Sequence, residues 1–253
     1  MELRIENGVL YGNIPGGYWN GNWDDEERLV ELVVPEGVTE IKERAFSGDP
    51  WISKVVIPGS VKVIGKEAFA VCSQLEVLVI EDGVERIEEE AFRNCRITDI
   101  VLPRHSLKYI GNRAFDENLF RELELPLELE YLGVASFRYN TELEIVSIPG
   151  TVRRIETGTF RGCSALETVI LQDGVEEIGE EAFSSCNNLL ELRIPDSLRL
   201  IGKDAFEGAA EYTDDGCVFP DFLLLSRDVV IEDDWFKYVA DTYNRYKRSN
   251  CCP

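Results

Sequence analysis

The stretch Ile57-Pro-Gly-Ser-Val-Lys-Val-Ile-Gly-Lys-Glu-Ala-Phe69 sets the architecture of this chain, because close variants of it recur along most of the sequence. A small residue followed by phenylalanine appears eight times, ending at Phe46, Phe69, Phe92, Phe115, Phe137, Phe160, Phe183 and Phe206. Successive phenylalanines are 23 residues apart, with a single interval of 22. A fixed period in the twenties is typical of a solenoid, in which each coil buries its apolar edge against the next.

Other apolar residues keep a fixed distance from each phenylalanine. Eight residues before it stand Val38, Val61, Val84, Leu107, Leu129, Val152, Val175 and Leu198. Five residues before it stand Ile41, Ile64, Ile87, Ile110, Leu132, Ile155, Ile178 and Ile201. One continuous helix or strand does not produce this register, whereas a coil with one buried residue at each corner does.

Each copy also contains a short aliphatic run, such as Val55-Val56-Ile57, that predicts a β-strand. Side chains alternate across a strand, so two residues of each run should point inward and the residue between them outward. The expected inward pairs are Leu32/Val34, Val55/Ile57, Leu78/Ile80, Ile100/Leu102, Leu123/Leu125, Val146/Ile148, Val169/Leu171 and Leu192/Ile194. The expected outward residues are Val33, Val56, Val79, Val101, Glu124, Ser147, Ile170 and Arg193.

The segment around each phenylalanine is predicted to be a short helical or 3₁₀ turn that directs the ring inward. Three residues after the phenylalanine stand Cys72, Cys95, Cys163 and Cys186, with Asn118 and Asn140 in the same position of other copies. A buried thiol or amide there can satisfy backbone groups of the turn. Since other copies have no cysteine at this position, we expect the thiols to be reduced, which fits an intracellular setting.

Two copies are irregular. The copy that ends at Phe115 has lost one residue before Ile100 and gained one after Pro103, and the next copy lacks one residue after Asn118. Insertions and deletions within repeats fall in loops on one face and alter the local shape of the coil.

The pattern L-x-x-V-x-I-P-x-x-V-x-x-I-G-x-x-A-F-x-x-C resembles the BspA-like leucine-rich repeats of bacterial and protist proteins, over roughly residues 1–209. The opening Ile5-Glu-Asn-Gly-Val-Leu-Tyr11 is similar to the first segment of that family. The resemblance implies a β-rich solenoid, α+β by content, of about eight coils with one strand and one short helical turn each. It implies little about function, beyond the binding of other proteins by some surface-located members.

Three regions are expected along the chain. Residues 1–28 form an N-terminal cap with a hairpin around Asn7-Gly8, because Asn-Gly favours a tight primed turn. Residues 29–209 form the leucine-rich repeat solenoid. Residues 210–253 form a C-terminal cap, with one or two closing strands at Phe219-Pro-Asp-Phe-Leu-Leu-Leu225 and Val229-Val-Ile231 and a helix from about Trp235 to Arg248.

Composition excludes several classes of function. The net charge of −22 opposes nucleic-acid binding, which depends on phosphate neutralisation by Lys and Arg. With one histidine and no C-x₂-C pair, the chain predicts no metal site, and it contains no nucleotide-binding or hydrolase motif, so we expect no cofactor. His105 has no nucleophile tied to it by sequence, and the paired carboxylates Glu88-Glu89-Glu90, Glu176-Glu177 and Glu180-Glu181 indicate a solvated face more than catalysis. We therefore expect no enzyme.

No apolar run reaches the ~18 residues of a membrane span. The N-terminus lacks the basic and apolar pattern of a signal peptide, which predicts a cytoplasmic protein as written. Secretion or display at the cell surface, as in similar proteins, is the alternative.

The strongest candidate site is the expected outward row Val33, Val56, Val79 and Val101, flanked by Glu31, Lys54 and Val77. A contiguous apolar patch on an acidic protein indicates a surface that contacts another protein or peptide. The competing interpretation is that valine is simply a good strand former and that the N-terminal loop folds over the row. Neither the partner nor the oligomeric state follows from the sequence.

A second candidate is the glycine- and aromatic-rich segment that contains Tyr18, Trp19 and Trp23. These rings most simply cover the open edge of the first coil. The alternative is a stacking platform for a glycan or peptide, which would make the protein a cell-surface adhesion or glycan-binding module.

Overall fold

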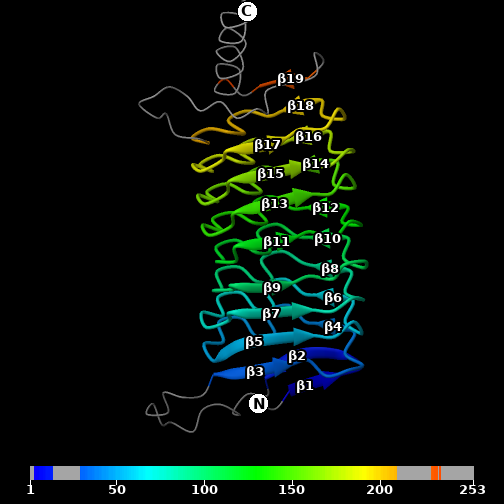
Figure 1. Ribbon diagram of the computed structural model, residues 1–253. Helices are drawn as coiled ribbons and strands as arrows, with labels where there is room; N and C mark the ends of the chain where they lie inside the picture. Colours follow the sequence, from blue (N-terminus) through cyan, green and yellow to red (C-terminus); the bar gives the residue numbers. More distant parts are fainter. Residues whose placement is uncertain (1–2, 14–28, 210–228, 233, 235–253) are drawn as a thin grey trace, which may run out of the picture.

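The computed structural model describes residues 3–13, 29–209, 229–232 and 234. The described chain forms a stack of coils that rises from the N-terminal to the C-terminal end as an elongated column, with a ladder of parallel strands on each of two faces (Figure 1). This confirms the predicted β-rich solenoid. Each coil contributes two strands, however, where one was expected.

The longer strands form one face in two separate sheets. The first sheet consists of β3 (Val30–Val33), β5 (Ile52–Ile57), β7 (Val77–Ile80) and β9 (Asp99–Val101). The second consists of β11 (Glu122–Glu124), β13 (Ile145–Ile148), β15 (Thr168–Leu171) and β17 (Glu191–Arg193). Within each sheet, residues at the same position of successive copies lie side by side.

Short strands form the other face, and all of them except β1 and β2 have two residues. One sheet joins β1 (Leu3–Glu6) and β2 (Val9–Asn13) to β4 (Glu40–Ile41), β6 (Val63–Ile64), β8 (Arg86–Ile87), β10 (Tyr109–Ile110) and β12 (Tyr131–Leu132). The other consists of β14 (Arg154–Ile155), β16 (Glu177–Ile178), β18 (Leu200–Ile201) and β19 (Val230–Ile231). From β4 to β18, each of these strands places the isoleucine or leucine that stands five residues before the phenylalanine in the core.

The eight phenylalanines form a continuous column inside the solenoid. From Phe46 to Phe206 their ring centroids are 5.1 to 5.6 Å apart and the rings are within 11° of parallel. The chain completes seven coils between the first ring and the last. The predicted corner residues are buried as well, so the sequence register correctly identified the core.

The predicted helical turn around each phenylalanine is wrong. Residues two before and two after the ring have left-handed backbones, as at Glu67 (φ 54°) and Val71 (φ 63°), and this alternation prevents a helix. Glu67, Phe69 and Val71 each donate their backbone N–H to a carbonyl of the following coil, at 2.8 to 2.9 Å. The segment is therefore a third inter-coil ladder made of turns, and no helix spans more than one residue in the described part of the chain.

The cysteine position performs the predicted role. Cys72, Cys95, Cys163 and Cys186 are buried and unbridged, and each thiol donates to the carbonyl of the phenylalanine one coil earlier, at 3.2 to 3.3 Å. Asn118 and Asn140 donate from their side-chain amides to the equivalent carbonyls at 2.9 Å. Burial raises the pKa of the Cys163 thiol to about 12 and that of Cys186 well above its ordinary value. Both thiols therefore stay protonated and unreactive in the folded protein.

The two ends of the chain are described in part. β1 and β2 pair antiparallel around Asn7 and Gly8, both with positive φ, which confirms the predicted hairpin. β19 pairs with β18 and confirms the predicted closing strand. The expected strand at 219–225 and the expected helix from Trp235 to Arg248 lie outside the described residues, and the boundaries expected for the two caps stay predictions.

Replacing one central ring of the column tests its contribution to stability. Phe160→Ala should lower the free energy of unfolding by about 3–5 kcal/mol, because the ring is completely buried between Phe137 and Phe183. Urea denaturation measures the change. Leu190→Ala, at a leucine that is 58% exposed, is the control and should change stability by less than about 0.5 kcal/mol. Equal effects of the two substitutions would contradict the stacked core.

The buried thiols predict a loss of stability in alkali. The pKa of Cys163 is about 12 in the folded protein against 9.0 for a free thiol, so above pH 9 the unfolded state binds fewer protons and stability falls. Between about pH 9 and pH 11 this one thiol should account for about 2 kcal/mol. Cys163→Ser keeps a donor that does not titrate, so its free energy of unfolding should fall less over this range. Identical pH dependence in both proteins would contradict the assignment.

Candidate protein-interaction face

The register of the first sheet brings the predicted apolar residues into one row. Val33 lies beside Val56, Val56 beside Val79, and Val79 beside Val101, on four adjacent strands. The residues before and after them on each strand point into the core, which leaves the valines on the outward side. We call this row, Val33, Val56, Val79 and Val101, the valine face.

The valine face is open to solvent at both ends and shielded in the middle. Val33 is 60% exposed and Val101 is 55% exposed, whereas Val56 and Val79 are half-buried because each has a valine on either side. Four adjacent β-branched side chains form a continuous apolar strip with little conformational freedom to lose on contact.

The flanking row is mixed in character. Glu31, Lys54, Val77 and Asp99 lie side by side in the same register. Lys54 donates to Glu31 at 3.1 Å, and Val77 separates this ion pair from Asp99. The predicted residues Lys54 and Val77 therefore do flank the valine face, and Val77 widens its apolar area.

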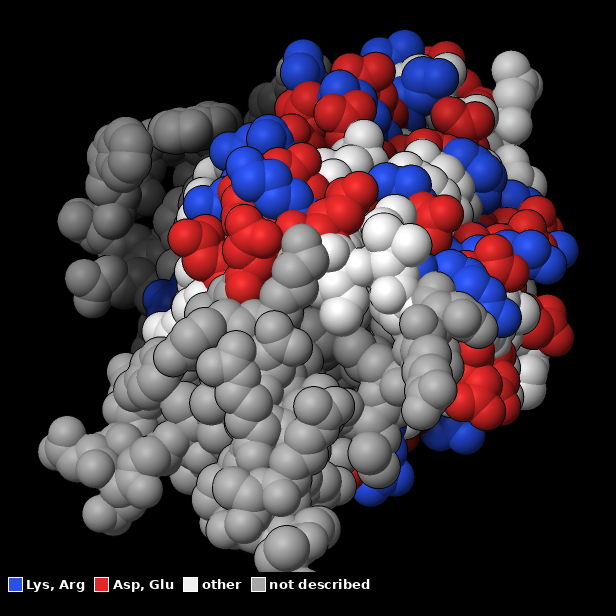
Figure 2. Space-filling view, turned by 90° about the horizontal axis from the view of Figure 1, so that it is seen from above, with Lys and Arg blue, Asp and Glu red and all other residues white. Residues whose placement is uncertain are grey.

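The second sheet carries no such strip. At the position of the valines it has Glu124, Ser147, Ile170 and Arg193 in one row. Seen from the C-terminal end, acidic and basic side chains are interspersed around the sides of the column (Figure 2). The apolar strip is therefore a local property of the first four long strands.

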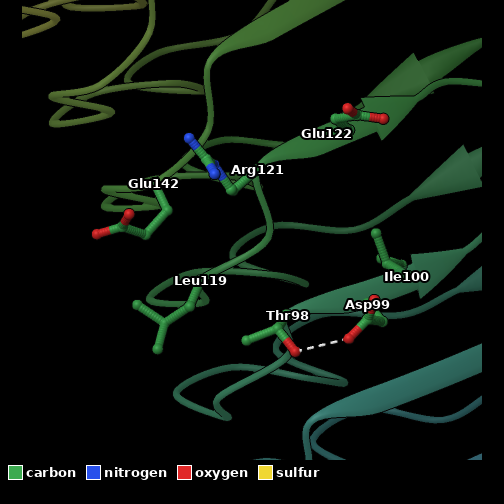
Figure 3. Close-up of a pocket in the computed structure, with 7 residues that line it drawn as sticks. All are labelled: Thr98, Asp99, Ile100, Leu119, Arg121, Glu122 and Glu142. Atoms are coloured by element: carbon green, nitrogen blue, oxygen red, sulfur yellow. Dashed lines mark hydrogen bonds between the residues drawn. The ribbon is translucent and has the colours of Figure 1, made fainter.

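Two further features did not emerge from the sequence. The first is a solvent-open cavity of about 620 Å³ between β9 and β11, lined by Thr98, Asp99, Ile100, Leu119, Arg121, Glu122 and Glu142 (Figure 3). The second is an aromatic stack on the short-strand face, where the rings of Tyr109 and Tyr131 are 4.9 Å apart and the guanidinium of Arg86 lies 3.8 Å from the centre of Tyr109. The sequence contains a signal for each feature. The residue missing after Asn118 marks the position of the cavity, and the shared repeat position of Tyr109 and Tyr131 marks the aromatic stack.

The other predicted residues are placed as follows. Carboxylates of the acidic runs form partly exposed ion pairs between coils, with Lys66 donating to Glu89 at 2.9 Å and Arg154 to Glu177 at 2.8 Å. His105 is exposed, and its backbone N–H bonds to Asp82. Tyr18, Trp19 and Trp23 lie outside the described residues, so the stacking platform stays a prediction.

No group of three or more His, Cys, Asp or Glu side chains in the described part of the chain is arranged to hold a metal ion. No helix in that part is long and apolar enough to cross a membrane.

Comparisons with known proteins agree with this architecture. A leucine-rich repeat protein from Bacteroides ovatus has 26% identity and a TM-score of 0.69, over 85% of this chain and 66% of that chain, so this chain spans slightly less than two thirds of its length. The leucine-rich repeat protein of T. pallidum has 32% identity and a TM-score of 0.57, over 64% of this chain and 78% of that chain. The search of curated proteins found no match. A family model described as "BspA type Leucine rich repeat region" matches in six copies, over residues 23–119 and 86–213, so the chain belongs to the BspA-type leucine-rich repeat family.

Proposed function

We propose that this protein is a non-enzymatic scaffold that binds another protein through the valine face. The observation that supports this most is the alignment of Val33, Val56, Val79 and Val101 in one row on the outward side of a sheet. The equivalent row of the second sheet is polar at three of its four positions, so strand propensity alone does not account for the valines.

The energetics favour a contact surface. Covering the side chain of an exposed valine such as Val33 contributes on the order of 1.5 kcal/mol, and a row of four provides enough apolar area to anchor a partner. The ion pair of Lys54 and Glu31 gives the strip a polar border, as protein interfaces commonly have. The partner should therefore present an apolar ridge or strand that follows the row.

The chemistry of the described residues supports binding over catalysis. Four cysteines that would be the natural nucleophiles are buried and donate to backbone carbonyls. Carboxylates of the acidic runs, such as Glu89 and Glu177, are partly exposed and engaged in ion pairs between coils. The proposal holds equally for a cytoplasmic protein and for one displayed at the cell surface.

Charge placed on the valine face should abolish partner capture. Val56→Glu combined with Val79→Glu introduces two carboxylates in adjacent strands, and their desolvation in an interface should weaken binding at least tenfold. The measurement is a pull-down from the source organism with the wild-type protein and the variant, with mass spectrometry of the retained proteins.

The matched control is Ser147→Glu combined with Ile170→Glu, at the equivalent register of the second sheet. Both variants place like charges side by side, which costs each a similar 0.2–1 kcal/mol of stability. Thermal melting should therefore show similar melting temperatures. A protein retained by the wild type and the control and lost by the valine variant supports the proposal, and equal retention by all three would refute it.

A further inference from the structure

The long-strand face of the solenoid is interrupted between β9 and β11. No ladder joins these two strands within the described residues, although β7 pairs with β9 on one side and β11 with β13 on the other. The interruption is confined to the strands, because just before them Leu119 still donates its backbone N–H to the carbonyl of Ile97 in the preceding coil, at 3.0 Å. β9 and β11 also stand visibly further apart than β7 and β9 (Figure 1). The strand edges that face each other across this split therefore lack the neighbour that every other inner edge of the face has.

The sequence explains the position of the split. The two copies that contribute β9 and β11 are those that lost a residue between the phenylalanine turn and the strand. In the second of them Phe120 occupies the core position that is leucine or isoleucine in the other copies, and its ring lies edge-on to Phe115 and Phe137 at 6.5 and 6.1 Å. A shorter connection and a larger ring directly before β11 displace this strand from its neighbour.

The split exposes part of the core. Ile100 is the inward residue of β9, and the residues at its position in the neighbouring strands, Leu78 and Leu123, are 0% and 5% exposed. Ile100 is only partly buried and lines the cavity of about 620 Å³ together with Leu119.

The outward rim of the cavity is acidic. Asp99, Glu122 and Glu142 are exposed and line it, and the Asp99 carboxylate accepts a hydrogen bond from Thr98 at 2.9 Å (Figure 3). The one cation in the lining, Arg121, is engaged by Glu144, a hydrogen bond that raises the pKa of the guanidinium. The unbalanced charge at the rim is therefore negative.

We propose that the split is a second binding site, which accepts an extended, basic peptide as an added strand between β9 and β11. The peptide backbone pairs with the two open edges, as in other cases of strand addition. Alternate side chains of the peptide point inward and cover Ile100, and those between them point outward, where cationic residues lie between Asp99 and Glu122. This site is distinct from the valine face, although β9 contributes to both.

The probe is a fluorescein-labelled octapeptide of alternating lysine and valine, with binding measured by fluorescence anisotropy. Its counterpart carries an N-methyl group on the amide of each valine, which blocks hydrogen bonds along one edge and leaves the charge unchanged. Strand addition predicts binding of the parent peptide and at least tenfold weaker binding of the methylated one.

Two protein variants separate the site from general attraction to an acidic protein. Asp99→Asn with Glu122→Gln should weaken binding at least tenfold. Glu128→Gln with Glu207→Gln removes the same charge from exposed positions away from the cavity and should change it less than twofold. Val56→Thr with Val79→Thr alters the valine face and should leave the affinity for the peptide unchanged. This variant therefore distinguishes a failure of the peptide site from a failure of the function proposed for the valine face.

Hydrogen exchange supplies an independent readout. In the free protein the amides of β11 should exchange faster than those of β13, which has a partner on both sides, and the parent peptide should protect them. Equal affinity for the two peptides, equal losses in the two carboxylate variants, or no binding of the parent peptide at about 1 mM would each overturn the proposal.

Discussion

The structure depends on one repeated contact, in which a phenylalanine ring stacks on the ring of the next coil while the turn around it donates backbone hydrogen bonds in the same direction. Phe69 lies 5.2 Å from Phe92, and the N–H groups of Glu67, Phe69 and Val71 all donate to the following coil. This contact joins the apolar column of phenylalanine rings to a ladder of backbone hydrogen bonds along the edge of the column. A coil cannot form either half of it alone, which is why the repeat must be stacked to be stable.

This column also explains how the solenoid tolerates an interruption of its sheets. The long-strand face is broken between β9 and β11, and the short-strand face between β12 and β14. The rings of Phe115, Phe137 and Phe160 nevertheless stay stacked, at 5.4 and 5.6 Å. Beside them the buried carboxylate of Asp116 accepts hydrogen bonds from Arg138 in the next coil at 2.7 and 3.0 Å. Because the turns around the phenylalanines connect each coil to the next, the strand faces are free to vary. Both proposed binding sites lie on these strand faces.

The two sites follow from different physical situations on one face. The valine face is a complete sheet whose outward side chains are apolar, so it offers side-chain contacts to a partner. The split offers backbone groups and an acidic rim, which suit the extended and basic peptide proposed for it. The first sheet thus presents a surface of outward side chains, and its last strand, β9, presents an edge of backbone groups.

The sequence by itself determined the period, the buried corners, the outward row of valines, the N-terminal hairpin and the carbonyl-binding role of the cysteine position. Each of these depends on residues at a fixed spacing, and stacking carries that spacing directly into space. Tertiary structure alone decided the second strand of each coil, the left-handed turns at residues such as Glu67 and Val71, the Arg86–Tyr109–Tyr131 stack and the split. No local sequence signal predicts a left-handed backbone at a glutamate or valine, because the inter-coil hydrogen bonds impose that conformation. Likewise, a lost residue marks where a coil is irregular, but only the packing of Phe120 determines that the strands separate there.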